Sequence, residues 1–138
     1  HIQAAHFEQA TRILEPYLRA VSGDARAMNN QGLALLGLKR FDDARRILKK
    51  AAKVSPDEPF VQTNYGRALM GLGLASEARP HHEQALRALP ADTRLLAHYG
   101  ICLAALGELD RARETLDAAL AADPNNEEAL LARAGLDA

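Results

Sequence analysis

The chain has 138 residues, and its 17 lysines and arginines against 18 aspartates and glutamates give a net charge of −1. Because the two signs are mixed along the sequence, composition favours neither nucleic acid nor an acidic membrane surface as a partner. Hydrophobic residues make up 48% and aromatic residues only 4%, which favours helices over strands. The one cysteine, Cys102, cannot form a disulfide within the chain, and no run of 18 apolar residues marks a membrane span. The location stays open between cytoplasm and a bacterial periplasm or envelope.

Identical residues recur along the chain at a spacing of 34 positions. Six such columns share one spacing, far more than chance would give, so the sequence predicts a repeat architecture. We expect three full repeats, at 25–58, 59–92 and 93–126. The columns are Gly32, Gly66 and Gly100; Leu35, Leu69 and Leu103; Leu38, Leu72 and Leu106; Ala44, Ala78 and Ala112; Ala51, Ala85 and Ala119; and Pro56, Pro90 and Pro124.

Residues 1–24 predict the end of an earlier, partial repeat, which begins in the tail of its first helix and holds mainly its second helix. Its apolar residues Phe7, Ala10 and Leu14 lie 34 positions before Phe41, Ala44 and Leu48. Pro16 and Tyr17 stand where helical and small residues are expected, so we expect this segment to be irregular.

The first full repeat predicts two helices joined by a turn near residues 39–41. Met28, Leu35 and Leu38 form an apolar stripe at helical spacing in the first helix. The second helix should begin at an N-cap, for which aspartate and serine are well suited. Proline after the second helix ends the repeat. The expected caps in the three repeats are Asp42, Ser76 and Asp110.

Small residues in the repeat predict close approach between helices. Gly32 should face Ala44 across the helix pair, and Ala51 should admit the first helix of the next repeat. One pair cannot bury its apolar face alone, so the repeats should stack into a superhelix.

The later repeats depart from the pattern in two places. Pro80 lies inside a second helix and is expected to bend it or delay its start. His82 occupies a column that elsewhere holds Leu14, Leu48 and Leu116. Residues 127–138 predict a partial or capping helix.

The sequence resembles the tetratricopeptide repeat family over nearly its whole length. The residues that carry the resemblance are Asn64-Tyr65-Gly66, His98-Tyr99-Gly100, the alanine columns and the closing prolines. The resemblance implies an all-α, right-handed superhelical solenoid of antiparallel helix pairs. It also implies that the first helices line a concave groove in which partners, usually peptides, lie. The composition, rich in alanine, leucine and arginine, is typical of bacterial repeats.

Carried over position by position, the resemblance places one set of residues from each repeat in the groove. They are Arg26, Asn29, Asn30, Leu33 and Leu36; Phe60, Thr63, Asn64, Arg67 and Met70; and Arg94, Ala97, His98, Ile101 and Ala104.

Asn30 and Asn64 are the strongest candidates, because they stand at equivalent points one repeat apart. A carboxamide both donates and accepts hydrogen bonds, so the pair suits the backbone of an extended peptide. Relatives that hold extended peptides use asparagines at this position. The alternative is that each asparagine is a solvated polar residue or bonds to a neighbouring helix.

A comparison with relatives that clamp a chain-terminal carboxylate gives only a partial match. Asn64 and Arg94 agree with that clamp, and His98 stands where a more basic residue is usual. Asn29 and Leu33 replace its first lysine and asparagine. A chaperone-tail adaptor is therefore not expected, although arginines at the groove favour an acidic peptide.

Three further features of the sequence bear on binding or chemistry: Phe60 with Met70, the adjacent histidines, and Cys102. Phe60 and Met70 are candidates for apolar contacts with a peptide, unless Phe60 packs on the preceding repeat. Adjacent His81 and His82 point about 100° apart on a helix, so no metal site is expected; His82 should be packed and His81 exposed. Cys102 is expected to be a small buried residue.

The sequence predicts no catalytic site and no cofactor. The leading hypothesis is a non-catalytic scaffold or adaptor that binds a peptide or protein segment in the groove. A second is a self-assembling module that stacks through its end repeats, for which Ala118, Leu120 and the stretch 127–136 are candidates. A third is a regulatory arm of a larger enzyme, such as a glycosyltransferase.

Overall fold

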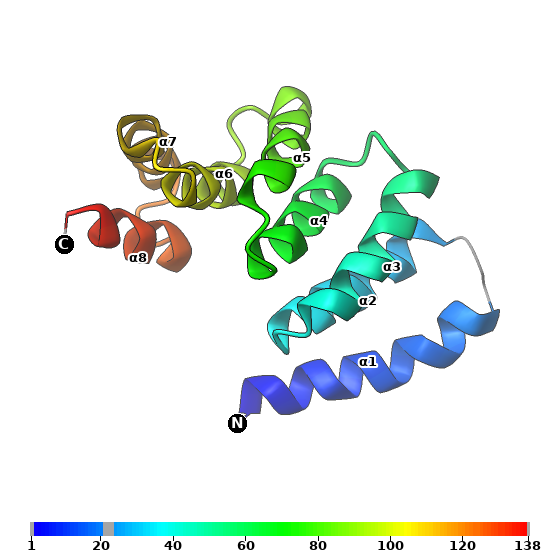
Figure 1. Ribbon diagram of the computed structural model, residues 1–138. Helices are drawn as coiled ribbons and strands as arrows, with labels where there is room; N and C mark the ends of the chain where they lie inside the picture. Colours follow the sequence, from blue (N-terminus) through cyan, green and yellow to red (C-terminus); the bar gives the residue numbers. More distant parts are fainter. Residues whose placement is uncertain (1, 21–23, 138) are drawn as a thin grey trace.

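The computed structural model describes residues 2–20 and 24–137, and in its first helix the side chains of residues 4–14. Within these residues the chain forms helices and no strand, and the helices pack pairwise into a right-handed superhelical solenoid (Figure 1). The helices are α1 (Ile2–Ala20), α2 (Ala25–Gly37), α3 (Phe41–Val54), α4 (Pro59–Gly71), α5 (Ala75–Ala88), α6 (Thr93–Ala105), α7 (Leu109–Ala122) and α8 (Glu127–Leu136). A helix begins at residues 25, 59, 93 and 127, where the repeats and the final helix are expected to start.

The helices form an inner and an outer layer. Helices α2, α4, α6 and α8 contact one another in succession, whereas α3, α5 and α7 contact only inner-layer helices among the residues that the structure describes. Closer spacing on one side curves a stack of helix pairs toward that side. The inner layer therefore forms the concave surface.

The first helix of each pair has a side-chain cap that was not predicted. Asp24, Glu58, Asp92 and Asn126 are 34 residues apart, and each accepts a hydrogen bond from a backbone N–H of the helix that follows. Such caps satisfy amides that the helix itself leaves without partners. This column fixes where every inner helix begins.

The predicted N-caps of the second helices are wrong. Asp42, Ser76 and Asp110 lie inside the first turn, and the N-cap positions hold Arg40, Leu74 and Glu108 without a side-chain cap bond. The reason lies in the turn before them. Lys39, Gly73 and Gly107 have φ of 59°, 79° and 81°, which reverses the chain tightly enough for residues 40, 74 and 108 to donate to Leu35, Leu69 and Leu103. The aspartates instead place negative charge at the helix N-terminus.

Gly32, Gly66 and Gly100, which form one column of the repeat, each face the residue 16 positions later. A Cβ on Gly32 would lie 2.4 Å from Leu48 Cγ, one on Gly66 2.7 Å from His82 Nε2, and one on Gly100 2.6 Å from Leu116 Cγ. The side chain of Leu48, one helical turn after Ala44, fills the space over Gly32. At the equivalent position a Cβ on Gly100 would also lie 3.6 Å from the carbonyl oxygen of Ala112, so a Gly32–Ala44 approach stays a prediction.

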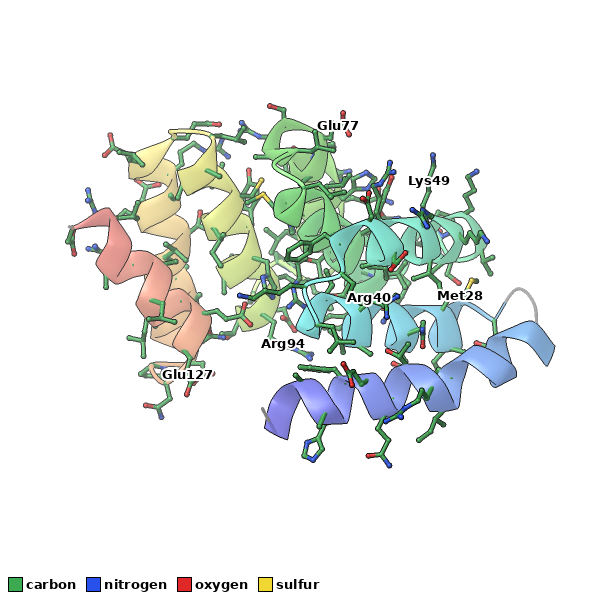
Figure 2. All side chains as sticks on the ribbon, turned by 60° about the horizontal axis from the view of Figure 1, so that its bottom comes forward. Met28, Arg40, Lys49, Glu77, Arg94 and Glu127 are labelled. Carbon is green, nitrogen blue, oxygen red and sulfur yellow. The ribbon has the colours of Figure 1, made fainter. Side chains whose placement is uncertain are left out.

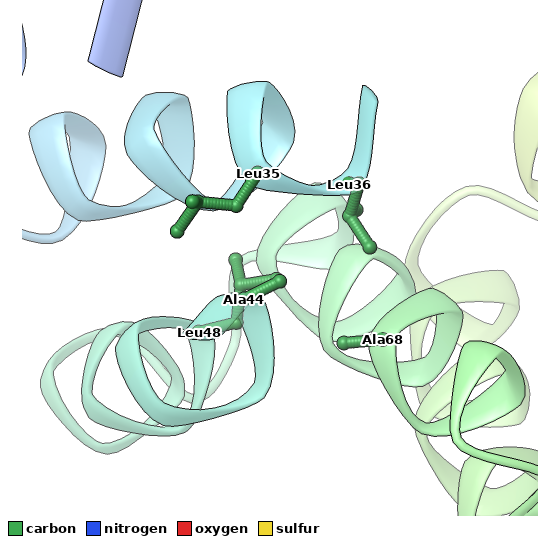
Figure 3. Close-up of a cluster of buried hydrophobic side chains, with 5 residues drawn as sticks. All are labelled: Leu35, Leu36, Ala44, Leu48 and Ala68. Atoms are coloured by element: carbon green, nitrogen blue, oxygen red, sulfur yellow. The ribbon is translucent and has the colours of Figure 1, made fainter. Parts of the chain in front are cut away.

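The small alanines bring successive repeats together. Ala44 packs with Leu35, Leu36, Leu48 and Ala68, so a cluster begun in one repeat includes a residue of the next (Figure 3). Met28 and Ala51 pack with Val61 of α4, which agrees with the expectation that Ala51 admits the next repeat.

Neither internal proline interrupts its helix. Helix α5 contains Pro80 and begins at Ala75, the position equivalent to the start of α3 and α7, so its start is not delayed. Helix α1 continues through Pro16 and Tyr17, so the predicted irregularity is not a break in the helix. The side chains of these two residues lie outside the described ones.

Candidate functional site

A pocket of about 360 Å³ lies on the concave surface between α2, α4, α6 and the start of α8. We call it the central pocket. Nine of the fifteen predicted groove residues line it: Asn29, Leu33, Phe60, Thr63, Asn64, Arg67, Arg94, Ala97 and His98. Its remaining lining residues are Asn126 and Glu128.

A chain of hydrogen bonds crosses the pocket from α2 to α4. Asn64 Nδ2 donates to Asn29 Oδ1 over 3.0 Å, and an Arg67 guanidinium nitrogen donates to Asn64 Oδ1 over 3.2 Å. Asn64 is only 6% exposed. It therefore makes the bond to a neighbouring helix that was the alternative to peptide binding, and it holds the Arg67 guanidinium in place.

Asn30 does not share this environment. It is exposed and lines a neighbouring cavity of about 330 Å³ with Arg26, Asn29, Phe60 and other residues of α2 and α4. The two asparagines are equivalent in the repeat but lie in different cavities. A peptide-binding pair at Asn30 and Asn64 stays a prediction.

Arg94 is positioned by an aromatic ring. Its guanidinium carbon lies 4.4 Å from the centroid of the Phe60 ring, a cation–π contact between successive inner helices. In the view of Figure 2, Arg94 lies between α8 and α2. The contact orients the guanidinium while leaving Arg94 exposed to a ligand.

His98 lies deep in the pocket and is neutral at physiological pH. Burial lowers its pKa well below the ordinary value, and the charges of Arg67 and Arg94 and the nearby His82 lower it further. Its Nε2 is 3.1 Å from a carboxylate oxygen of Glu128. We infer that a neutral imidazole donates its Nε2–H to this carboxylate, so His98 adds a donor and no charge.

The pocket thus holds two arginines and one carboxylate. Burial lowers the pKa of Arg67, and the Glu128 carboxylate partly offsets this effect, but an arginine remains protonated in proteins. The excess positive charge and the fixed guanidinium groups suit a ligand with an anionic side chain.

A third cavity, of about 310 Å³, adjoins the central pocket and shares Arg67 and His98 with it. Most of its lining is apolar, and it includes Met70, Ile101 and Phe41. Met70, a predicted groove residue, therefore lies in this cavity and not in the central pocket.

The two adjacent histidines have different surroundings. His82 is buried as expected, with Nδ1 2.9 Å from Thr63 Oγ1 and no partner for Nε2 among the described residues. His81 was expected to be exposed, which is wrong: it is half-buried, with Nδ1 2.8 Å from Gln62 Oε1 and its ring edge-on to Tyr65. The side chains of α4 reach far enough to cover it.

Cys102 is fully buried, and burial raises the pKa of its thiol to about 11, so it is a packing residue as predicted. Among the described residues, no three His, Cys, Asp or Glu side chains group in a way that could hold a metal ion. No helix in the described part of the chain is long and apolar enough to cross a membrane.

Two pocket residues, Asn126 and Glu128, were not among the predicted groove residues. The stretch that follows Asn126 was expected to form an end helix or to contribute to self-association. The spacing contains the signal, because Glu128 lies 34 positions after Arg94 and 68 after Phe60. The same column thus contributes to the pocket from three successive inner helices.

The chain belongs to the tetratricopeptide repeat family. Models described as tetratricopeptide repeat match residues 1–59 and 69–136. No curated protein matches the chain in sequence.

Several solved structures share the fold at low sequence identity. MamA residues 41–end from Desulfovibrio magneticus RS-1 is 23% identical, with a TM-score of 0.79 over 95% of this chain and 74% of that one. The first repeat domain of Spaghetti (RPAP3), bound to the HSP90 peptide SRMEEVD, is 22% identical, with a TM-score of 0.74 over 85% and 93%. YrrB, described as having an unusual peptide-binding site, is 23% identical, with a TM-score of 0.73 over 96% and 68%.

Proposed function

We propose that this protein is a non-catalytic interaction scaffold that binds an acidic segment of a partner protein along its concave groove. The observation that carries the proposal is the pair of arginines in the central pocket, one held by Asn64 and the other by the Phe60 ring. Guanidinium groups fixed in this way bind carboxylates with less loss of side-chain freedom than mobile ones.

The arrangement of the cavities favours an extended protein segment over a small molecule. The central pocket shares Asn29 and Phe60 with the cavity at Asn30, and Arg67 and His98 with the apolar cavity at Met70. Three adjoining cavities along one surface suit consecutive side chains of one segment. The peptide complex of the RPAP3 domain, whose ligand contains acidic residues, supports this proposal by analogy of fold.

Selection of peptides from a random display library tests the proposal. We expect the wild-type chain to enrich peptides with acidic residues, and the variant Arg67→Gln with Arg94→Gln to lose them. The matched control is Lys49→Gln with Lys50→Gln, which removes two positive charges from exposed positions on α3. Enrichment of the same peptides by all three proteins, or of peptides without acidic residues, would contradict the proposal.

Self-association remains a second candidate because apolar side chains are exposed near both ends. Ile13 of α1 is 64% exposed, and Leu131 of α8 is 76% exposed. Sedimentation equilibrium of the wild type and of Ile13→Gln with Leu131→Gln distinguishes the two functions. If the wild type is an oligomer and the double variant is a monomer, end-to-end assembly is favoured. If both proteins are monomers, self-association is excluded as the function.

A further inference from the structure

The central pocket contains a carboxylate that belongs to the chain itself. Glu128, the second residue of α8, lines the pocket together with Arg67 and Arg94 and contacts His98. An acidic side chain from a partner would bind the same donors, Arg67, Arg94 and His98. Any acidic ligand of this pocket therefore meets a carboxylate already in place.

We infer that Glu128 is an internal competitor for the acidic side chain of the partner, which must displace it from beside Arg67 and His98. The inference rests on the proposed function, since it concerns the same pocket. Helix α8 would then help to set the affinity of the groove for acidic segments.

The side chain of Glu128 can leave the pocket while α8 stays folded. Its side chain is 53% exposed, so the carboxylate can rotate into solvent. Helix α8 is held by other contacts: the Asn126 cap on Ala129 N, the fully buried Ala129 side chain, and the ion pair between Arg133 and Asp117 at 2.8 Å. The contact with His98 is thus not needed to keep α8 in place.

The charges explain why displacement would matter for affinity. With Glu128 in place, its charge offsets one of the two arginines. Neutralising it leaves both positive charges to the ligand. Because the pocket is partly shielded from solvent, a unit charge there affects binding more than one on the open surface.

The variant Glu128→Gln tests the inference, with Glu127→Gln as its matched control. Glutamine keeps an oxygen that accepts from His98 Nε2–H but removes the charge. Glu127 is exposed on the same helical turn and does not line the pocket, so its substitution changes net charge by the same amount. Figure 2 labels Glu127 on α8.

The probes are fluorescein-labelled eight-residue peptides of alternating serine and glutamate, or alternating serine and glutamine. Fluorescence anisotropy at 0.1 M salt gives their affinities for the wild type, both variants and Arg67→Gln with Arg94→Gln. We expect Glu128→Gln to bind the acidic peptide about fivefold more tightly than the wild type, and Glu127→Gln to bind it like the wild type. Circular dichroism melts confirm that each variant is folded.

The outcomes separate this inference from the function on which it rests. If the acidic peptide binds the wild type in an arginine-dependent way and Glu128→Gln brings no gain, the function stands and the competitor role is overturned. An equal gain in both glutamine variants would show a net-charge effect and also overturn it. If no protein prefers the acidic peptide to the neutral one, the proposed acidic ligand fails, and the competitor role fails with it.

Discussion

The full repeats meet at two junctions: α3 contacts α4 at the first, and α5 contacts α6 at the second. The two junctions share a backbone arrangement but contain different polar groups. At the second junction, Tyr99 donates to Glu83 over 2.8 Å, Arg79 bonds to both Glu83 and Glu108, and Arg111 donates to Tyr99 over 3.0 Å and to Glu108. These side chains link α5, α6 and α7 in one charged network.

The first junction has no such network at the equivalent positions. Leu74 stands where Glu108 would be, Lys49 where Glu83 would be, and Arg45 Nε is buried without a partner among the described residues. Neutral contacts replace the network: Gln62 and Gln84 each donate to the carbonyl of Pro56 over 2.8 Å. The repeated small residues thus fix the helix geometry, while the polar groups around them are free to differ.

The largest expected effect comes from breaking the helix pair that both junctions share. Gly66→Leu would drive a side chain into His82, because even a Cβ at Gly66 would lie 2.7 Å from its Nε2. We expect a loss of about 3 kcal/mol of unfolding free energy, the upper end of the usual cost of overpacking. A urea melt measures it, and a curve equal to the wild type would refute this packing scheme.

Lowering the pH should destabilise the packing of α4 on α5 before it weakens the charged network at the second junction. Burial, with smaller contributions from His81 and Arg67, lowers the pKa of His82 to about 4. The unfolded chain then binds more protons between pH 6.5 and 4, so the contribution of His82 to stability, present above pH 6.5, falls across this window, by about 2 kcal/mol at pH 5. The lowered pKa values of His81 and His98 add to the loss of stability in acid. The hydrogen bonds from Arg79 and Arg111 lower the pKa of Glu108, so the contribution of its carboxylate is lost only below pH 4.5.

His82→Leu tests whether His82 causes the first loss of stability in acid. It introduces the residue type found at the equivalent positions, Leu48 and Leu116. We expect its stability advantage over the wild type to grow by about 2 kcal/mol between pH 7.5 and pH 5, measured by urea melts at each pH. His6→Gln, at an exposed position of α1, is the control. Parallel pH curves for wild type and His82→Leu would show that another group causes the acid sensitivity.

The fold was predictable from the sequence because six columns at one spacing constrain both helices of each pair. The start of the second helix was not, because aspartate at position 42 suits both an N-cap and a first turn, and the positive φ of Lys39 decides between them. The site was predictable only in outline. The spacing brings Asn64, Arg67 and Arg94 to one surface, but the bond between Asn64 and Asn29 depends on side-chain conformations that spacing does not fix.

A smaller effect compares the two junctions directly. Tyr99→Phe removes one donated and one accepted hydrogen bond, with an expected loss of about 1–2 kcal/mol. Tyr65→Phe changes the equivalent tyrosine, whose hydroxyl has no hydrogen bond among the described residues, and should change stability by less than about 0.5 kcal/mol. Amide exchange should speed up at α6 and α7 in the first variant only. Equal losses in both would remove the distinction between the junctions.

An effect on binding, beyond the stability lost with the hydrogen bonds of Asn64, is expected from the two asparagines. Asn30→Ala combined with Asn64→Ala should weaken binding of a selected acidic peptide, since Asn64 positions Arg67 and Asn30 lines the neighbouring cavity. The single variants show which asparagine matters, and we expect the greater loss from Asn64→Ala. Unchanged affinity in the folded double variant would remove both residues from the groove's function.

The smallest effect concerns a glycine that lies outside both junctions. Gly135 is in α8, and a Cβ there would meet no atom within 4 Å, in contrast to Gly66. Because alanine loses less backbone entropy than glycine on forming a helix, Gly135→Ala should stabilise the chain by about 0.5 kcal/mol. Gly66→Ala should destabilise it, although the change in helix propensity is the same. If both variants gained stability in thermal melts, the space over Gly66 would be larger than the structure shows, and close packing of α4 on α5 would not explain why its column holds glycine.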